Sequence, residues 1–387
     1  MNKILGFNPN HHGSACLLEE GELKYFIEEE RITRRKYDHH PFIAFMDILN
    51  NHKIDCITWA SPSLEYPTNN FFDNPYWCAI AAKFNKDSQF SDYSDQHHTS
   101  HCAHTFYNSG FKQSIGIVID GIGSSYFDYK KYWIGSETET AYYCSYPNNF
   151  EVLFKNINLP ESINLSRIYE TVTMHLGWDR NEAGKTMGLA PYGKFNPNIP
   201  NFFKNGIGDP KVFFFDQEKV LYTQHSTDND MLYDKTKDPI EIKAIHTFIN
   251  EDDNPQLKLQ RDPREWHYDE SKITDLEKDL AWKVQNDTQQ LVGDYIEKAI
   301  QKTGLKQVCC SGGYFLNCVT NYYLVKRFPD IEFYFEPLAS DAGTAIGSAK
   351  IQWHFENKDN TIRPLKSLYL GKQYSKEELL EGIKKYT

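Results

Sequence analysis

One order of predicted secondary structure occurs twice along this chain of 387 residues and constrains its fold more than any other feature. Short apolar runs bounded by turn residues predict strands, and longer amphipathic runs predict helices. The first copy, over about residues 1–112, has three strands followed by a helix, a strand and a helix. The second copy covers about 113–355 and is interrupted by a predicted helical insertion at about 160–275. Such a duplication predicts an α/β protein whose two lobes face each other across a cleft.

This element order is that of the actin, Hsp70 and sugar-kinase (ASKHA) architecture, which is the fold class that we predict. The predicted strands lie at about 3–8, 14–18, 23–29, 54–60, 114–120, 125–134, 139–146, 307–311 and 331–336. The longer helices are predicted at about 41–50, 276–302, 317–327 and 342–355. Residues 62–94 are aromatic and polar, and we interpret them as an irregular excursion.

Composition narrows the class of protein. Hydrophobic residues make up 40% of the chain, enough for a buried core, and the formal net charge of -11 argues mildly against a protein that coats duplex DNA. No apolar run approaches the ~18 residues needed to span a bilayer, and the apolar start at 1–7 is too short for a signal peptide. None of the eight cysteines forms a CxxC pair, so we expect reduced core thiols in a cytoplasmic protein.

Four histidines, His97, His98, His101 and His104, lie within eight residues. If this segment is a helix capped by Asp95, then His97 and His101 are one turn apart and project from the same face. Two neutral imidazoles at this spacing can bind one divalent metal ion. The alternative for the cluster alone is a histidine-rich surface turn that binds nothing.

Two aspartates extend this candidate metal site. Asp120 ends a predicted buried strand, where an unpaired carboxylate is costly, and Asp341 lies between a strand and a helix. With His97 and His101 they form a mixed nitrogen and oxygen set, which suits Fe2+, Mn2+ or Mg2+ better than structural zinc. Asp341 also fits the N-cap of the helix that follows, and the two roles are compatible.

Glycine-rich turns after two predicted strands are candidates for binding a phosphate or nucleotide. Gly121, Gly123 and Ser124 follow the strand that ends at 120, where backbone N–H groups can approach a phosphate. Gly312 and Gly313 follow a later strand. Either a base or ribose packs against this second turn, or the turn simply connects a strand to a helix.

Charged residues accompany these turns. Residues 182–193 include Lys185 and Gly188 but no complete Walker A loop, and Lys185 can still reach a phosphate as a point charge. The run at 28–36 carries four basic residues and is either a solvated face or an anion site at the mouth of the cleft. His12, in the loop after the first strand, is our candidate for acid–base chemistry because its ordinary pKa suits proton transfer near neutral pH. Most single loop histidines are only solvent-exposed.

Together these stretches resemble the O-carbamoyltransferases of the nodulation, cephamycin and tobramycin type, in the family's order over about residues 3–350. The matching segments are 4–6 with His12 and Ser14, 29–34 with Lys36, 97–101, 120–123, 182–193, 311–313 with Asn317, and 337–347. The amino-terminal domain of this family is similar to the Kae1/TsaD-like fold, which is the duplicated architecture predicted above.

The resemblance implies a reaction. Enzymes of this family make carbamoyl-adenylate from carbamoyl phosphate and ATP, and then pass the carbamoyl group to a hydroxyl. His12 would take the proton of that hydroxyl, while the metal and Lys185 or Arg34 would neutralise phosphate charge. The resemblance also implies the metal ligands His97, His101, Asp120 and Asp341. The residues implied to hold the adenine nucleotide are Gly121, Gly123, Ser124, Lys185, Gly188, Gly312, Gly313 and Asn317.

The chain departs from the family pattern in two places. The family usually has an aspartate after the histidine of the first hairpin, whereas this chain has Gly13, so a partner for His12 is lost or supplied elsewhere. The family also continues into a YrdC-like carboxy-terminal domain that forms the carbamoyl-adenylate. Here 356–387 are interpreted as a linker and the start of a truncated domain of that kind. Three explanations are open: a separate YrdC-like polypeptide supplies the domain, the protein uses an activated carbamoyl donor made elsewhere, or the chain is a truncated form. We favour the separate polypeptide.

Other functions are kept as alternatives. The acceptor of an O-carbamoyltransferase could be a sugar, a metabolite or a hydroxymethylated nucleobase or nucleotide, with its pocket in the 62–94 and 195–270 regions. A threonylcarbamoyl transferase acting on tRNA is the second candidate, although no strong basic stripe supports it. A non-catalytic nucleotide-binding protein on the same fold is the third. We expect no membrane partner, and a homodimer stays open.

Overall fold

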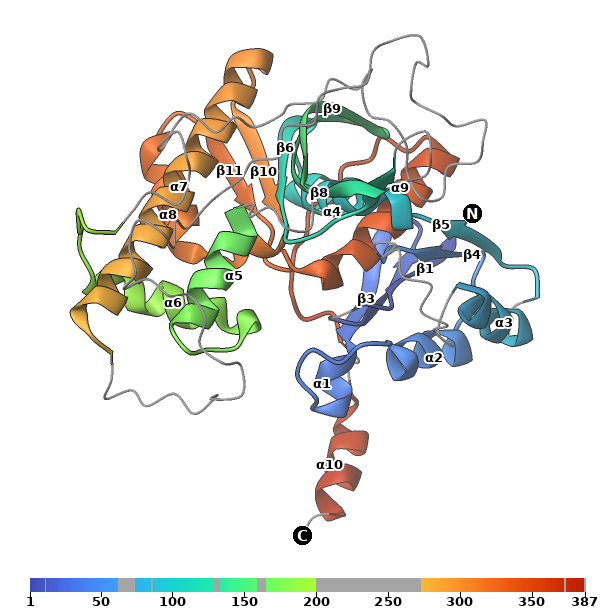
Figure 1. The fold of residues 1–387 in the computed structure, drawn as a ribbon. Coiled ribbons are helices and arrows are strands. Elements are labelled where there is room, and N and C mark those ends of the chain that lie inside the picture. The colour runs from blue at the N-terminus through green and yellow to red at the C-terminus, as the bar shows by residue number, and fades with distance from the viewer. Residues whose placement is uncertain are drawn as a thin grey trace.

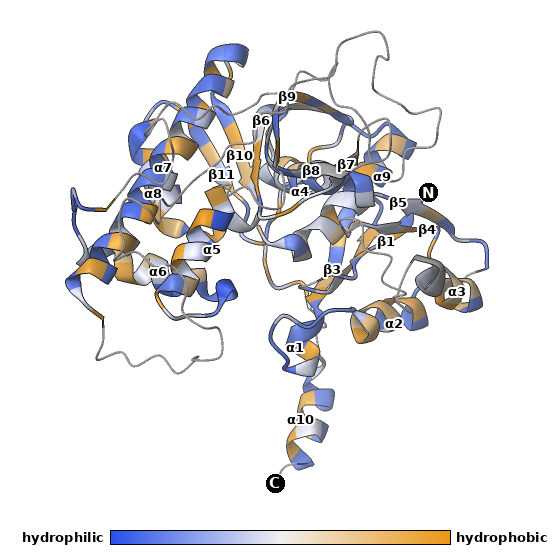
Figure 2. Cartoon of the chain, in the orientation of Figure 1, coloured by the Kyte–Doolittle hydropathy of each residue, from blue (hydrophilic) through white to orange (hydrophobic). Residues whose placement is uncertain are grey.

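The computed structural model describes residues 1–10, 12–61, 74–84, 86–127, 133–158, 165–199, 273–371 and 374–385. Most of the predicted insertion at 160–275 and part of the excursion at 62–94 therefore lie outside the described residues. The described chain folds around two β-sheets, and several of its helices pack on the faces of these sheets, whereas α10 (Lys376–Lys384) projects away from them (Figure 1). Hydrophobic residues are concentrated in the strands, whereas outer helices such as α7 carry hydrophilic faces (Figure 2).

The first sheet has five strands in the order β3-β2-β1-β4-β5. Its antiparallel half contains β1 (Lys3–Asn8), β2 (Ser14–Glu19) and β3 (Glu22–Glu28). Its parallel half adds β4 (Cys56–Trp59), which pairs with β1, and β5 (Gln89–Asp92), which pairs with β4. One face is covered by α2 (Phe42–Asn51) and α3 (Asn74–Phe84), with the fully buried rings of Phe7, Phe45 and Trp77 between helices and sheet.

The second sheet repeats this arrangement around β6 (Gln113–Ile119). β8 (Trp133–Ser145) pairs with β6 in antiparallel, and β10 (Gln307–Ser311) and then β11 (Glu332–Phe335) continue in parallel on the other side. β9 (Asn149–Asn158) pairs with β8, as β3 pairs with β2 in the first sheet. The short strand β7 (Ser125–Phe127) also pairs with β8 and has no equivalent in the described first sheet. α7 (Asp275–Thr303) and α8 (Cys318–Arg327) pack on one face. This topology confirms the predicted duplicated α/β fold of the actin and Hsp70 type.

Two helices, α4 (His97–Ser109) and α9 (Thr344–Asn357), pack against each other between the sheets (Figure 1). The helix at the end of each copy covers the sheet of the other copy: α9 packs on β1, β2 and β4, and α4 packs on β6, β8 and β10. The backbones approach closely, since a Cβ atom on Gly347 would lie 1.9 Å from the carbonyl oxygen of Ser100. The lobe boundaries predicted at 112 and 355 stay predictions.

The excursion predicted at 62–94 is more regular than expected, because it contains α3 and β5. The sequence signals are weak there, since the stretch around α3 mixes aromatic and polar residues and β5 has only four residues without strict alternation. β9 was also not predicted. The remaining described helices are α1 (Glu29–Thr33), α5 (Leu165–His175), α6 (Ala183–Leu189) and α10 (Lys376–Lys384).

Two simpler expectations can also be compared with the structure. The seven cysteines whose side chains the structure describes are free thiols, and all of them except Cys318 are buried. Among the described residues, no helix is both long enough and apolar enough to cross a membrane.

Glu29 shows that the charged run at 28–36 is more than a solvated face. Its side chain is 3% exposed, and its two carboxylate oxygens accept hydrogen bonds of 2.9 Å from the backbone N–H groups of Ile43 and Ala44. These groups lie in the first turn of α2, which has no side-chain cap of its own. Glu29 thereby ties the run to the first lobe, whereas Arg34 and its basic neighbours are exposed.

We expect Glu29→Ala to lower the free energy of unfolding by about 2 kcal/mol, because two buried N–H groups lose a charged acceptor. Urea unfolding followed by circular dichroism measures this change. Glu381→Ala on the exposed face of α10 is the matched control, and an equal midpoint for both variants would contradict the assigned cap.

Candidate metal centre

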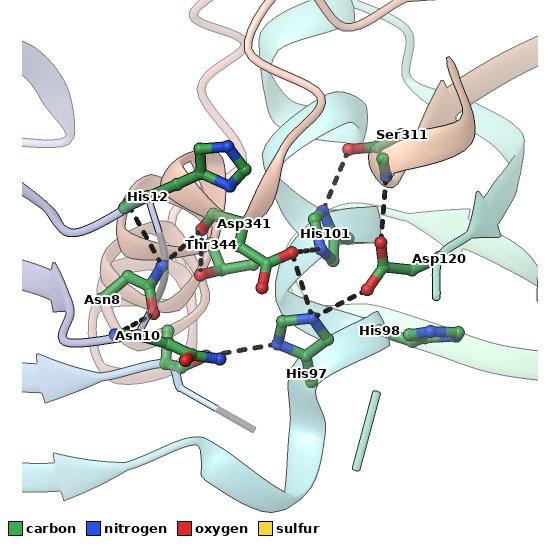
Figure 3. Close-up of polar contacts among 12 residues, drawn as sticks. Asn8, Asn10, His12, His97, His98, His101, Asp120, Ser311, Asp341 and Thr344 are labelled. Atoms are coloured by element: carbon green, nitrogen blue, oxygen red, sulfur yellow. Dashed lines mark hydrogen bonds and ion pairs between the residues drawn. The ribbon is translucent and has the colours of Figure 1, made fainter. Parts of the chain in front are cut away.

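Four buried side chains converge where the two lobes meet (Figure 3). His97 and His101 come from α4, Asp120 follows β6, and Asp341 begins the short 3-10 helix η7 (Asp341–Gly343). One ligand atom from each of the four residues lies within 4.8 Å of the others. The structure therefore brings together all four residues that the sequence proposes as metal ligands.

The individual distances place the imidazoles against the carboxylates. Nε2 of His97 lies 3.5 Å from Oδ2 of Asp120 and 3.7 Å from Oδ1 of Asp341. Nε2 of His101 lies 3.4 Å from the same Asp341 oxygen. The two imidazole rings, one helical turn apart, have centroids 4.7 Å apart. Both rings thus direct a nitrogen at one point.

The start of α4 is fixed by residues of the second copy. Asp95 does not cap the helix as predicted: the N-cap residue is Gln96, and no side chain caps it locally. Instead, the His97 N–H donates to Oγ of Ser124 at 3.1 Å, and the His98 N–H donates to Oε1 of Glu137 at 2.9 Å. Short-range sequence rules search for a cap within a few residues, so they could not find these partners.

The outer nitrogens of both rings have partners of their own. Nδ1 of His97 lies 3.4 Å from the carbonyl oxygen of Ala60, and Nδ1 of His101 lies 3.3 Å from Oγ of Ser311. Oδ1 of Asp120 accepts a hydrogen bond of 3.1 Å from the N–H of Gly313. Contacts of this kind orient the ligands in metal sites and leave the inner Nε2 atoms for the ion.

The donor set fits a divalent cation. Within the part of the chain that the structure describes, the buried Nε2 atoms of His97 and His101 have no other hydrogen-bond partner, whereas buried polar atoms are normally paired. Burial opposes a charged His97, but the nearby carboxylates of Asp341 and Asp120 outweigh it and raise its pKa to about 10. Two imidazoles and two carboxylates suit Fe2+, Mn2+ or Mg2+, as the sequence suggests.

We expect metal binding to release one proton. His97 must be neutral to bind a metal, and its pKa is raised to about 10, so at pH 6–8 the ion displaces its proton. The apparent affinity should rise about tenfold for each pH unit in this range. Calorimetric titration in two buffers of different ionisation enthalpy measures the released proton. A binding enthalpy and affinity that do not depend on buffer or pH would contradict this assignment.

The backbone of Asp341 is joined to the loop that carries His12. Nδ2 of Asn8 donates to the carbonyl oxygen of Asp341 at 3.1 Å and to that of His12 at 3.4 Å. Figure 3 shows His12 on the Asp341 side of the four residues. The alternative role of Asp341 as an N-cap is not what the structure shows, since the N-cap residue of α9 is Gly343. His12 is half-buried and has a φ of 60°.

The turn after Asp120 is built mainly for packing. Oγ of Ser124 accepts from His97 and donates to the carbonyl oxygen of Ser94 at 3.1 Å. The N–H of Gly123 donates to the carbonyl oxygen of Glu137 at 2.8 Å, and a Cβ atom there would lie 2.4 Å from that side chain. These two predicted nucleotide contacts are therefore engaged within the protein. Gly121 lies beside Glu170, whose Oε1 would be 3.5 Å from an added Cβ.

The second glycine turn touches the first. Gly312 has a φ of 98°, and a Cβ atom there would lie 2.3 Å from the carbonyl oxygen of Ile119, so only glycine suits this position. Gly313 donates to Asp120. Asn317 caps α8 through the Thr320 N–H and donates to Oε1 of Gln285 at 2.8 Å.

The predicted phosphate contacts Lys185, Gly188 and Arg34 are not part of the four-residue group. Lys185 is half-exposed on α6 and pairs with Glu182 at 2.8 Å. Gly188 is exposed, and no atom of the described residues lies within 4 Å of an added Cβ. Arg34 is exposed at the end of α1, in a left-handed conformation.

Sequence reasoning missed several residues around the site. Asn8 and Ser311 contact candidate functional residues directly, and both belong to stretches that carry other candidates. Behind α4, Glu137 forms a buried ion pair of 2.7 Å with Lys155. No local pattern marks this pair, because its two residues lie on neighbouring strands and meet only in the folded sheet.

Comparison with known proteins places most of the chain in one group. Residues 71–350 match the family described as the carbamoyltransferase N-terminus. An uncharacterized protein of Synechocystis sp. is 24% identical over 99% of this chain and 63% of its own length. The nodulation protein NolNO of Sinorhizobium fredii is 23% identical over 96% of this chain and 50% of its own length. The chain thus spans between half and two-thirds of these two relatives.

A solved structure, HypF of T. kodakarensis, aligns with 92% of this chain and 48% of its own chain. The sequence identity is 15% and the TM-score is 0.46.

Proposed function

Because this chain belongs to the carbamoyltransferase N-terminus family, we propose that it is the transfer subunit of an O-carbamoyltransferase. The donor is carbamoyl-adenylate, formed from carbamoyl phosphate and ATP. The acceptor is a hydroxyl of a sugar, a metabolite or a hydroxymethylated nucleobase. The observation that carries the proposal is the buried group His97, His101, Asp120 and Asp341 with the His12 loop hydrogen-bonded beside it.

The transfer step needs a base. The acceptor oxygen forms a bond to the carbamoyl carbon, the bond from this carbon to the phosphate oxygen of the adenylate breaks, and AMP leaves. The hydroxyl proton passes to a ring nitrogen of His12, because imidazole is a common general base near neutral pH. Support comes from Asn8, which bonds the His12 backbone to that of Asp341 and so holds base and candidate metal ligands together.

The phosphate charge needs positive partners. A divalent cation held by the two histidines and two aspartates would supply positive charge next to the phosphate. Arg34 and Lys185 have exposed side chains, so both can turn toward an incoming phosphate. We propose them as the charges that hold the adenylate.

The nucleotide is proposed to lie on the turn that contains Gly312 and Gly313. This turn is fixed against β6, and it has no side chains at two successive positions. Asn317 caps the next helix, and Gly121, Gly123 and Ser124 form the adjoining turn, so these four are proposed to shape the pocket. Gly188 and Lys185 would lie at its edge on α6.

The transfer step needs carbamoyl-adenylate that has already been formed from ATP and carbamoyl phosphate. The chain spans 63% and 50% of the lengths of the two curated relatives. We propose that a YrdC-like protein makes the carbamoyl-adenylate and that this chain uses it.

Mass spectrometry of reaction products tests this function. The metal-loaded protein is supplied with ATP and 13C-labelled carbamoyl phosphate, with and without extract from the native source. A labelled hydroxyl compound heavier than the free acceptor by about 44 Da, the mass of the 13C-carbamoyl group in place of hydrogen, supports transfer and identifies the acceptor. Product only with extract supports a separate adenylate-forming protein. Bound nucleotide without product in either mixture supports a nucleotide-binding protein, and labelled tRNA supports the threonylcarbamoyl alternative.

A further inference from the structure

Unusual backbone conformations gather in two facing loops of the first lobe. Among the described residues, six non-glycine residues have positive φ, and four of them lie here: His12 (60°), Arg34 (62°), Tyr37 (59°) and His40 (62°). Such conformations are unfavourable for non-glycine residues and persist where the surrounding structure enforces them, often at functional sites.

Hydrogen bonds hold the two loops together. The N–H of Gly13 donates to the carbonyl oxygen of Asp38 at 2.9 Å. The N–H of Tyr37 donates to Oε2 of Glu30 at 2.9 Å. The loop that contains Tyr37 is therefore held to the His12 loop by a backbone hydrogen bond and to α1 by the Glu30 side chain.

Position 13 leaves little room for a side chain. A Cβ atom on Gly13 would lie 3.0 Å from the carbonyl oxygen of Asp38 and 3.1 Å from the N–H nitrogen of His40. The facing loop thus crowds the position at which the family resemblance implies an aspartate beside His12. In this chain the glycine at position 13 offers no side chain that could orient the imidazole.

The side chain of Tyr37 lies where such a group is needed. Its ring meets the His12 ring edge to face, with centroids 5.1 Å apart and an interplanar angle of 75°. Its hydroxyl donates to the carbonyl oxygen of Asn181 at 2.9 Å. Asn181 belongs to the 3-10 helix η2 (Arg180–Glu182), directly before α6 with Lys185. Tyr37 therefore connects His12 in the first lobe with the residue that directly precedes the 182–193 segment.

We propose that Tyr37 is a positioning residue for His12. It couples the position of the 182–193 segment to the orientation of the His12 imidazole. The ring limits the rotation of His12, and the hydroxyl holds the ring in place through Asn181. The effect of Tyr37 on carbamoyl transfer rests on the proposed function. The contact between the Tyr37 and His12 rings can be tested independently of that function.

Two variants separate the ring from the hydroxyl. Tyr37→Leu removes the ring, and Tyr37→Phe removes only the hydrogen bond to Asn181. Tyr143→Phe is the matched control. Tyr143 lies on β8, away from the His12 loop, and the substitution removes a hydroxyl that donates to the Gln113 side chain at 3.4 Å. Thermal unfolding of each variant confirms that the fold is native.

The first readout is the NMR signal of the His12 ring in 13C-histidine-labelled full-length protein, assigned by its absence in His12→Asn. We expect Tyr37→Leu to shift this signal and its titration midpoint, Tyr37→Phe to shift it less, and the control to leave it unchanged. An unchanged His12 signal in natively folded Tyr37→Leu would overturn the proposal, whether or not the protein transfers carbamoyl groups.

The second readout is the pH profile of carbamoyl transfer with extract. Tyr37→Leu should lower kcat by about 100-fold. It should also shift the limb of the pH profile that reports deprotonation of the base, His12. Tyr37→Phe should raise KM about tenfold with kcat nearly kept. Wild-type kcat in Tyr37→Leu would also overturn the proposal. Absence of transfer in the wild-type protein would overturn only the proposed function.

Discussion

Replacing His12 by alanine is expected to lower carbamoyl transfer by about 100- to 10,000-fold, because the acceptor hydroxyl loses its base. Metal and ATP binding should stay intact, since the His12 side chain is not among the four candidate ligands. Product formation by mass spectrometry measures the loss, and calorimetric titration with metal and with ATP measures the two affinities.

Two further variants make this test specific. His12→Asn suits the left-handed backbone at this position better than alanine, so it separates loss of the base from loss of the loop conformation. His39→Ala, in the facing loop and exposed, is the matched control. Loss of ATP binding in both His12 variants would contradict the role of His12 as a base, as would transfer at the wild-type rate.

Replacing His97 by alanine is expected to weaken metal binding by at least about 100-fold, because one of four buried donors is removed. The metal-free protein should also become less stable near neutral pH. There the raised pKa of His97 leaves its imidazole charged between Asp120 and Asp341, and the variant leaves these two buried carboxylates without that charge.

Metal content after dialysis and the thermal midpoint of the metal-free protein measure the two effects. His52→Ala, at the end of α2 and away from the four-residue group, is the matched control. A full metal complement in His97→Ala would show that the ion binds elsewhere.

Much of the fold could be predicted because the strongest signals are local. β1, β6 and β10 are continuous apolar runs, and α7 is a long amphipathic helix with a capping box at Thr274 and Glu277. Their order alone predicted the duplicated topology. β5 and β9 escaped prediction because their short or weakly alternating sequences become strands only when a neighbouring strand supplies their hydrogen bonds.

The candidate metal ligands could be predicted for a related reason. The one-turn spacing of His97 and His101 is a local pattern, and Asp120 and Asp341 each interrupt apolar sequence where a carboxylate needs a partner. Long-range contacts could not be predicted in this way. Ser124 caps α4 from another lobe, and Tyr37 meets Asn181 across 144 positions of sequence.

The stoichiometry between AMP and carbamoylated product tests the central claim most directly. Metal-loaded protein, ATP, 13C-labelled carbamoyl phosphate and native extract are combined, and both products are quantified by mass spectrometry over time. The account predicts one AMP for each labelled hydroxyl product, with formation of both abolished by His12→Asn. Labelled product without matching AMP, or product formation that His12→Asn leaves unchanged, would contradict transfer from carbamoyl-adenylate at this site.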